Sequence, residues 1–230
     1  GRSADPSRSP PRPASTSPDC AGRRRTDLGV SREPGLLGTG PRTWTQQGTT
    51  FVASLTAAES LATGVTVSTG DRYGNAVDIS GDRIAIGAPE SASGKGLVYT
   101  YERTGTTWGD KQAFAYPTGA SGDHFGASVA LDGDQLIVGA YGRDVTLNGT
   151  TYADLGAAYA YHFDDGQWRL DPPGDGNRLT AADGFSGDNV GFAVAVSGDQ
   201  VIVGAPQLNG RPGDAIDTDG AGYFYVRHVS

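Results

Sequence analysis

The sequence has no methionine, a single cysteine (Cys20) and only two lysines among its 230 residues. One cysteine excludes an internal disulfide and a zinc site built on several thiolates. No apolar run approaches the ~20 residues that a membrane-spanning helix needs. The net charge of −8 argues against general binding to nucleic acid or to an anionic membrane surface. The missing initiator methionine predicts a processed chain or a fragment.

Glutamate is scarce as well, because 22 of the 26 acidic residues are aspartate. The chain contains instead 36 glycines and 13 prolines. Aspartate, glycine and proline form turns, whereas a helical protein is rich in glutamate, lysine and leucine. The composition therefore predicts an all-β protein of short strands joined by tight turns.

Residues 1–43 differ from the rest of the chain. They contain no aromatic residue, seven of the prolines, and eight arginines against four acidic residues. Such a segment cannot bury enough apolar surface to offset the entropy cost of ordering it. We predict a disordered Ser/Pro/Arg-rich arm. The three consecutive arginines at 23–25 give the alternative of a basic tether for anionic partners.

From Trp44 onward the chain repeats one pattern, with copies that begin at residues 70, 122 and 187. Each copy opens on Gly-Asp, reaches a second glycine three residues after the aspartate, and runs into two short apolar segments separated by Gly-Asp. A Gly-Asp pair between apolar strands predicts a two-residue hairpin, because glycine accepts a positive φ. The second strand, as in residues 136–138, is continuously apolar, which predicts burial on both faces.

A third strand in each copy alternates as Tyr-x-Tyr or Tyr-Phe-Tyr, which predicts that one of its faces is exposed. Trp108 and Trp168 open a fourth strand in the first two copies. Four antiparallel strands per unit are typical of a β-propeller blade. A solenoid and a plain sandwich are alternatives that fit four-strand units less well.

The Phe125-Gly126 opening and the Gly-Ala-Pro close of the second strand at 87–89 and 204–206 resemble the FG-GAP repeat. This repeat is the blade unit of integrin α-subunit propellers and of many secreted bacterial proteins. The segments at 44–57 and 178–181 resemble the outer strand of the bacterial type.

The copies depart from the family pattern at three positions. Tyr73 and Val190 replace phenylalanine, and Tyr141 replaces proline. The resemblance nevertheless extends over residues 44–230.

The predicted propeller segment has four parts. These are an outer strand at 44–69, blades at 70–121 and 122–186, and a partial blade at 187–230. Propellers close with about 4–8 blades. About three blades therefore predict a piece of a larger ring, or copies of the chain that associate to complete one.

Calcium is the one cofactor that the resemblance raises, in the hairpin between the first two strands of a blade. The hairpins here are too short to supply the about six to eight oxygen ligands that calcium takes. A different acidic loop, with Asp214, Asp217 and Asp219, matches half of a calcium-loop pattern but has Ala215 where a ligand is needed. Turn formation is the alternative role for these aspartates.

No catalytic motif emerges from the sequence. His124, His162 and His228 share no common spacing, and neither His-Glu-x-x-His nor Gly-x-Ser-x-Gly occurs. We therefore predict that the chain is not an enzyme.

Two long loops, 141–155 and 206–220, are the predicted binding surface, because loops held on a rigid scaffold concentrate recognition. They combine aromatic and polar groups of the kind that interfaces use. The candidate binding residues are Tyr141, Arg143, Tyr152, Asn209 and Arg211.

The resemblance implies a secreted or cell-surface module that binds a protein or glycan. Two alternatives are a structural spacer and a non-catalytic propeller segment of a larger secreted hydrolase.

Overall fold

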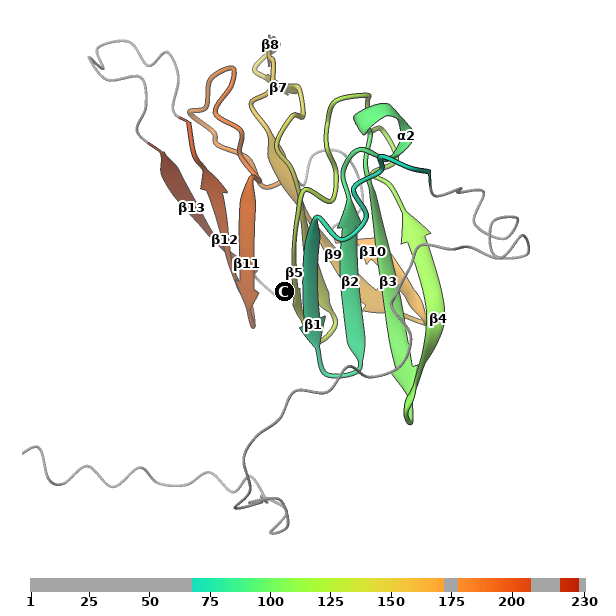
Figure 1. Cartoon of the computed structure of the whole chain (residues 1–230). Coiled ribbons are helices and arrows are strands. Elements are labelled where there is room, and N and C mark those ends of the chain that lie inside the picture. Colours follow the sequence, from blue (N-terminus) through green and yellow to red (C-terminus); the bar gives the residue numbers. More distant parts are fainter. Residues whose placement is uncertain (1–67, 172–177, 208–219, 228–230) are drawn as a thin grey trace, which may run out of the picture. The chain divides into compact units, whose positions relative to one another are not determined.

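The computed structural model describes residues 68–171, 178–207 and 220–227 (Figure 1). The chain divides into two units, residues 1–49 and 50–230, and every described residue belongs to the second. The predicted arm at 1–43 lies outside the described residues, as does nearly all of the predicted outer strand at 44–69.

The described residues form three consecutive antiparallel sheets, each built as a meander (Figure 1). The first sheet contains β1 (Ala76–Ser80), β2 (Arg83–Ala88), β3 (Leu97–Thr104) and β4 (Thr107–Phe114). The second contains β5 (Ser128–Asp132), β6 (Gln135–Ala140), β9 (Ala157–Asp164) and β10 (Gln167–Leu170). The third contains β11 (Ala193–Ser197), β12 (Gln200–Ala205) and β13 (Ala221–Val226). The prediction of an all-β protein is confirmed, and the first two sheets have the predicted four strands.

The turns between the first two strands of each sheet are the predicted two-residue hairpins. Ser80 pairs with Arg83, and the other two sheets repeat this register. The glycine that opens each turn has a positive φ. These glycines are Gly81 (56°), Gly133 (57°) and Gly198 (54°).

In the first two sheets the predicted burial is right for the second strand and wrong for the third. In the third sheet the prediction fails for the second strand, because β12 alternates and Ile202 is 50% exposed. In β6 every residue after Gln135 is buried.

The first five residues of β3, however, are all buried, so Tyr99 and Tyr101 do not lie on a half-exposed strand. The reason is that tyrosines of neighbouring loops cover these rings. Tyr73 packs edge-on against Tyr99 at a centroid distance of 5.1 Å, and Tyr116 stacks on Tyr159 of β9 at 3.9 Å. Only β13, in the third sheet, alternates as predicted.

The glycines of the repeat let neighbouring sheets touch through their backbones. A Cβ atom on Gly87 would lie 1.9 Å from the carbonyl oxygen of Gly126, and one on Gly139 would lie 2.0 Å from that of Gly191. Because no side chain can occupy that space, the close of one copy packs against the opening of the next.

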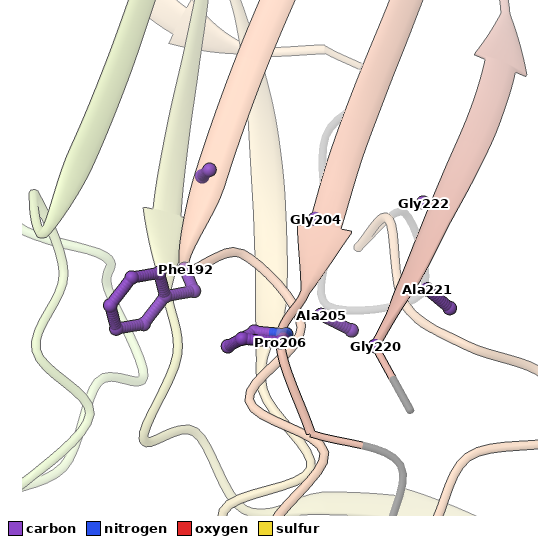
Figure 2. Close-up of a pocket in the computed structure, with 8 residues that line it drawn as sticks. Phe192, Gly204, Ala205, Pro206, Gly220, Ala221 and Gly222 are labelled. Atoms are coloured by element: carbon purple, nitrogen blue, oxygen red, sulfur yellow. The ribbon is translucent and has the colours of Figure 1, made fainter. Parts of the chain in front are cut away.

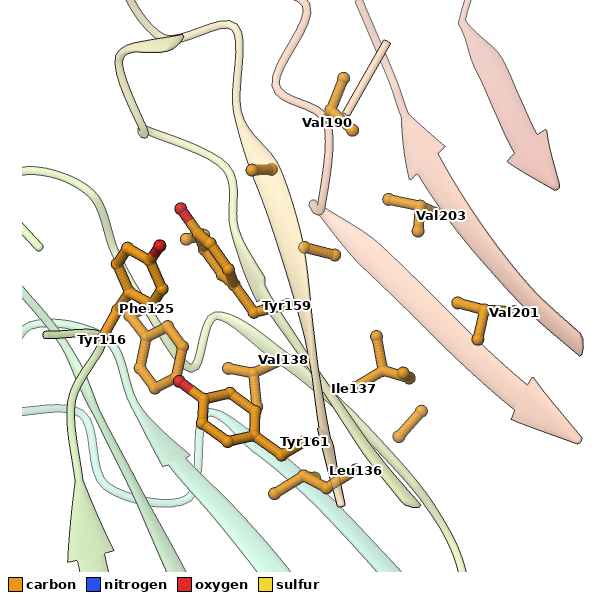
Figure 3. Packing of buried hydrophobic residues seen from close by; sticks show 14 of the residues in the cluster. Tyr116, Phe125, Leu136, Ile137, Val138, Tyr159, Tyr161, Val190, Val201 and Val203 are labelled. Atoms are coloured by element: carbon orange, nitrogen blue, oxygen red, sulfur yellow. The ribbon is translucent and has the colours of Figure 1, made fainter. Parts of the chain in front are cut away.

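In the second and third copies, the residue before the second glycine of the opening motif is buried in the same contact between sheets. Phe125 and Val190 are 1% and 0% exposed, and they form parallel bridges with Gly96 and Gly156 of the preceding sheet. Figure 3 shows Phe125 among Tyr116, Tyr159 and Tyr161 in the largest core cluster. The closing motif of one copy and the opening motif of the next thus form the contact between two neighbouring sheets. We call this contact a seam.

The outer strand of the second sheet resumes beyond β10. Leu179 and Ala158 exchange two backbone hydrogen bonds of 2.8 Å each. The resemblance of residues 178–181 to an outer strand therefore agrees with the structure.

Candidate functional site

The loops that join the second and third strands gather at one end of the sheets, which we call the upper end (Figure 1). The first sheet places the single turn α2 (Ser91–Gly94) there, and the second places a small hairpin of β7 (Val145–Leu147) and β8 (Thr150–Tyr152). The two-residue turns lie at the opposite end.

A buried aspartate fixes the opening turn of each copy at this end. Its Oδ2 atom accepts a hydrogen bond from the backbone N–H of the residue three positions earlier, at 2.8–2.9 Å. The residue after the aspartate takes a left-handed backbone conformation. These residues are Arg72, His124 and Asn189, with φ of 53°, 56° and 57°. The motif thus places one non-glycine side chain at the same corner of each sheet.

Two of these corner residues belong to a continuous line of side chains. Glu90 Oε1 lies 3.6 Å from both Arg72 Nη1 and His124 Nδ1. The His124 ring stacks on Tyr141, with 4.8 Å between centroids and 16° between planes. Tyr141 in turn contacts Phe192 at a centroid distance of 5.6 Å. We call Arg72, Glu90, His124, Tyr141 and Phe192 the upper ridge.

The upper ridge draws on all three sheets and on loops distant in the sequence. Arg72 and Glu90 flank the first sheet, His124 and Tyr141 the second, and Phe192 precedes β11. The third corner residue, Asn189, donates from Nδ2 to the carbonyl oxygen of Tyr141 at 3.2 Å, which holds the Tyr141 backbone. The ridge is therefore a surface that exists only once the sheets are stacked.

Exposure and charge vary along the upper ridge. The Arg72 side chain is 67% exposed and Phe192 is 55% exposed, whereas the side chains of Glu90 and His124 are 30% and 22% exposed. Burial raises the pKa of Tyr141 above its ordinary value, and the nearby Glu90 carboxylate adds to this effect. At neutral pH the ridge presents a cation at one end and neutral aromatic rings at the other.

The structure assigns the predicted residue Arg143 to an internal contact. Its Nη1 atom donates to Asp123 Oδ2 at 2.8 Å and to the Thr118 carbonyl oxygen at 3.0 Å. The side chain is only 14% exposed, and its guanidinium lies 5.6 Å from the centre of the Tyr116 ring. This geometry ties the loop after β6 to the opening turn of its own sheet.

The predicted residue Tyr152 lies on β8 and packs edge-on against Phe185, with 6.1 Å between ring centroids. The loop at 141–155 is thus an ordered hairpin, anchored by the buried Val145 and Leu155. Tyr141, Arg143 and Tyr152 each have a separate set of partners. The other predicted residues lie outside the described part of the chain. They are Asn209, Arg211, Asp214, Asp217 and Asp219.

The aspartates of the two-residue turns are engaged by arginines. Asp82 accepts from Arg103 at 2.8 Å, Asp134 from Arg83 at 2.5 Å, and Asp199 from Arg227 at 3.3 Å. Among the described residues no group of three histidine, cysteine or acidic side chains could hold a metal ion. The proposed calcium loop at 214–219 lies outside them.

Sequence reasoning missed four of the five ridge residues. A signal was present for two of them, because Arg72 and His124 occupy the same position of the opening motif. Glu90 and Phe192 carried no signal, because each is joined to the ridge by a contact with a neighbouring sheet, Glu90 with His124 and Phe192 with Tyr141.

Stacked four-stranded antiparallel sheets joined in this way are those of a β-propeller repeat protein, here with three sheets described. The FG-GAP repeat model matches residues 50–101, 108–161 and 174–226, which is more than half of the chain. The chain belongs to the FG-GAP repeat family. Repeats of this family typically occur in extracellular proteins and in modules of the binding or adhesion type.

The matched repeats are offset from the sheets. The second match begins in β4 of the first sheet and ends in β9 of the second. The second and third matched repeats therefore each link two sheets, because the third includes Leu179, which bonds to β9 of the second sheet, and ends in β13. No curated protein matches the chain. Within the described residues, no helix has the length and apolar character needed to cross a membrane.

Proposed function

We propose that the chain is a non-catalytic binding module of the extracellular space, and that the upper ridge recognises a protein or glycan ligand at a cell surface. The observation that carries this proposal is the convergence of Arg72, His124, Tyr141 and Phe192 from three sheets on one surface. A rigid scaffold that presents loops at one end is a common basis for recognition.

The chemistry of the upper ridge supports this role. An exposed arginine can form paired hydrogen bonds with a carboxylate or sulfate group. Aromatic rings add large contact area at a low entropy cost, because few torsions must be fixed. We therefore infer an acidic ligand with an apolar face, which describes both an acidic glycan and an acidic segment of a protein.

The test is to probe a glycan array and a panel of purified cell-surface glycoproteins with the full chain. Arg72→Gln removes the exposed cation of the upper ridge. Arg103→Gln is the matched control, because Arg103 is also exposed and paired with one acidic residue, but on the hairpin between β3 and β4. We expect Arg72→Gln to weaken binding at least tenfold and Arg103→Gln to leave it unchanged.

Two outcomes would contradict the proposal. If neither panel contains a ligand, a spacer role is favoured over recognition. If both variants lose affinity equally, the binding depends on overall charge and not on the upper ridge.

A further inference from the structure

The third sheet exposes an apolar face that its counterpart in the second sheet buries. Ile202 is 50% exposed, whereas Ile137, at the same position of its strand, is 1% exposed. Phe224 and Val226 on β13 are 61% and 45% exposed on the same face. We call Ile202, Gly204, Phe224 and Val226 the tail face. Contiguous exposed apolar side chains of this kind mark interaction sites.

A pocket lies at the upper part of the tail face (Figure 2). It is lined by Phe192, Ala193, Gly204, Gly220 and residues adjacent to them. In the other two sheets, the corresponding place is where the closing motif packs against the opening motif of the next sheet. Gly204 occupies the position of Gly87 and Gly139, where an added Cβ atom would collide with the next sheet. A Cβ on Gly204 would meet nothing closer than 3.5 Å. The third sheet therefore has the closing side of a seam, but within the described residues no opening motif packs against it.

The first sheet has the opening side of a seam, but within the described residues no closing motif packs against it. A Cβ on Gly74 would meet nothing within 4 Å, whereas one on the corresponding Gly126 would lie 2.5 Å from the Leu97 carbonyl oxygen. Val77 and Ile79 on β1 are 65% and 59% exposed, although Leu131, which corresponds to Ile79, is 6% exposed. We call Tyr73, Gly74, Val77 and Ile79 the head face.

We propose that the tail face of one copy of this chain receives the head face of a second copy. The argument is continuity with the two seams inside the chain, because each open face is the counterpart of a face that those seams cover. Such a head-to-tail contact is heterologous, so it forms a closed ring or an open array. Two copies with two such contacts give six sheets, within the range of about 4–8 blades at which propellers close.

Hydrogen bonds at the opposite end of the sheets give a second correspondence between the internal seams and the proposed interface. The turn residue Gly133 donates its N–H to Ser80 Oγ at 3.0 Å, and Gly198 donates to Asp132 Oδ2 at 2.7 Å. By the same register, Ser197 of one copy accepts from the N–H of Gly81 in the second copy. The proposed interface thus has a polar pair at one end and an apolar pocket at the other.

Sedimentation of the full chain, alone and in mixtures, tests this arrangement. Phe224→Asp places a charge on the tail face, and Val77→Asp places one on the head face. Both side chains are largely exposed within one chain, so each variant should fold. We expect the original chain and the control Thr150→Asp to be dimers. Each face variant alone should be a monomer, with a dissociation constant raised at least a hundredfold.

An equimolar mixture of the two face variants distinguishes this interface from others. The Phe224→Asp chain keeps its head face and the Val77→Asp chain keeps its tail face, so the mixture should recover a dimer through one intact contact. Should a variant lose its circular dichroism spectrum, Ile202→Ser and Ile79→Ser form a second pair.

Three results would overturn the proposal. A monomeric original chain means that another segment, such as residues 44–67, or another blade covers the two faces. A face variant that still dimerises places the interface elsewhere. A mixture that stays monomeric excludes the pairing of head and tail faces.

Discussion

The second and third sheets have nearly the same strand sequences but differ in burial. Residues 136–138 read Leu-Ile-Val and are all buried, whereas residues 201–203 read Val-Ile-Val and bury only the two valines. The difference arises from the neighbours, because the second sheet has a sheet on each side and the third has a described sheet on one side only. Burial is here a property of the stack and not of the strand.

The largest test of this comparison is the pair Ile137→Ala and Ile202→Ala. Ile137 is fully enclosed between sheets, so truncation should lower the free energy of unfolding by about 2–5 kcal/mol. Ile202 has half of its surface exposed, and its truncation should cost about 0.5 kcal/mol or less. Urea unfolding in dilute solution measures both values. Equal costs would mean that the tail face is covered within a single chain.

A second pair of variants, Gly139→Ala and Gly204→Ala, tests the comparison between the second and third sheets at the glycines of their closing motifs. Neither Gly139 nor Gly204 has a positive φ, so alanine causes no backbone strain at either position. A Cβ at Gly139 collides with the Gly191 backbone and should cost about 1–3 kcal/mol.

The same change at Gly204 has room and should be neutral or stabilising by about 0.5 kcal/mol. Thermal unfolding of the two variants checks the sign of each effect. Destabilisation by Gly204→Ala would show that the pocket in the third sheet is already filled.

Alkaline pH tests the corresponding tyrosines Tyr161 and Tyr225. Burial raises the pKa of Tyr225 to about 12, and burial raises the pKa of Tyr161 further. Because the folded chain holds these protons above the ordinary pKa of about 10, stability is complete below pH 10 and falls as the pH rises. The expected loss approaches about 1.4 kcal/mol per pH unit for the buried Tyr161 and is smaller for the half-buried Tyr225, because solvent screens its charge.

Absorbance of the tyrosinate form during an alkaline titration identifies which ring ionises first. Tyr225→Phe should remove an early step, and Tyr161→Phe should remove only a step that coincides with unfolding. A Tyr161 ring that ionises before Tyr225 would contradict the burial difference between the second and third sheets.

The sequence was sufficient to predict the all-β class, the repeat, the two-residue turns and the outer strands marked by Trp108 and Trp168. These features depend on local periodicity and turn chemistry, which are written in consecutive residues. The exposure of β3 was predicted wrongly, because a neighbouring sheet or loop covers the face that Tyr-x-Tyr alternation left open.

The candidate site could be predicted only in small part. Tyr141 was identified, but His124 reaches it from the opening turn of the same copy, 17 residues earlier, and Phe192 reaches it from the next copy. Arg143 was chosen as an exposed polar group, whereas Asp123 and Thr118 bind it from a turn some twenty residues earlier. Contacts between copies are not encoded in any single copy.

The smallest effect concerns the turn arginines. Arg83 crosses a seam, where Nη1 donates to Asp134 and the guanidinium lies 4.0 Å from the centre of the Phe163 ring. Arg103 stays within its own sheet and pairs with Asp82. Arg83→Ala should cost about 1 kcal/mol, and Arg103→Ala about 0.3 kcal/mol or less, because exposed ion pairs contribute little.

Salt separates the ion pairs of Arg83 from its ring contact. Raising the ionic strength screens the ion pairs with Asp134 and Glu102, which are 57% and 30% exposed, but leaves the packing on Phe163. The cost of Arg83→Ala in urea unfolding should therefore shrink only in part at 1 M salt. The cost of Arg103→Ala should shrink by a larger share, because the Arg103 guanidinium lies farther from its ring, 5.5 Å from the centre of Trp108. If both costs vanish, the contact between the first and second sheets gains nothing from the packing of Arg83 on Phe163.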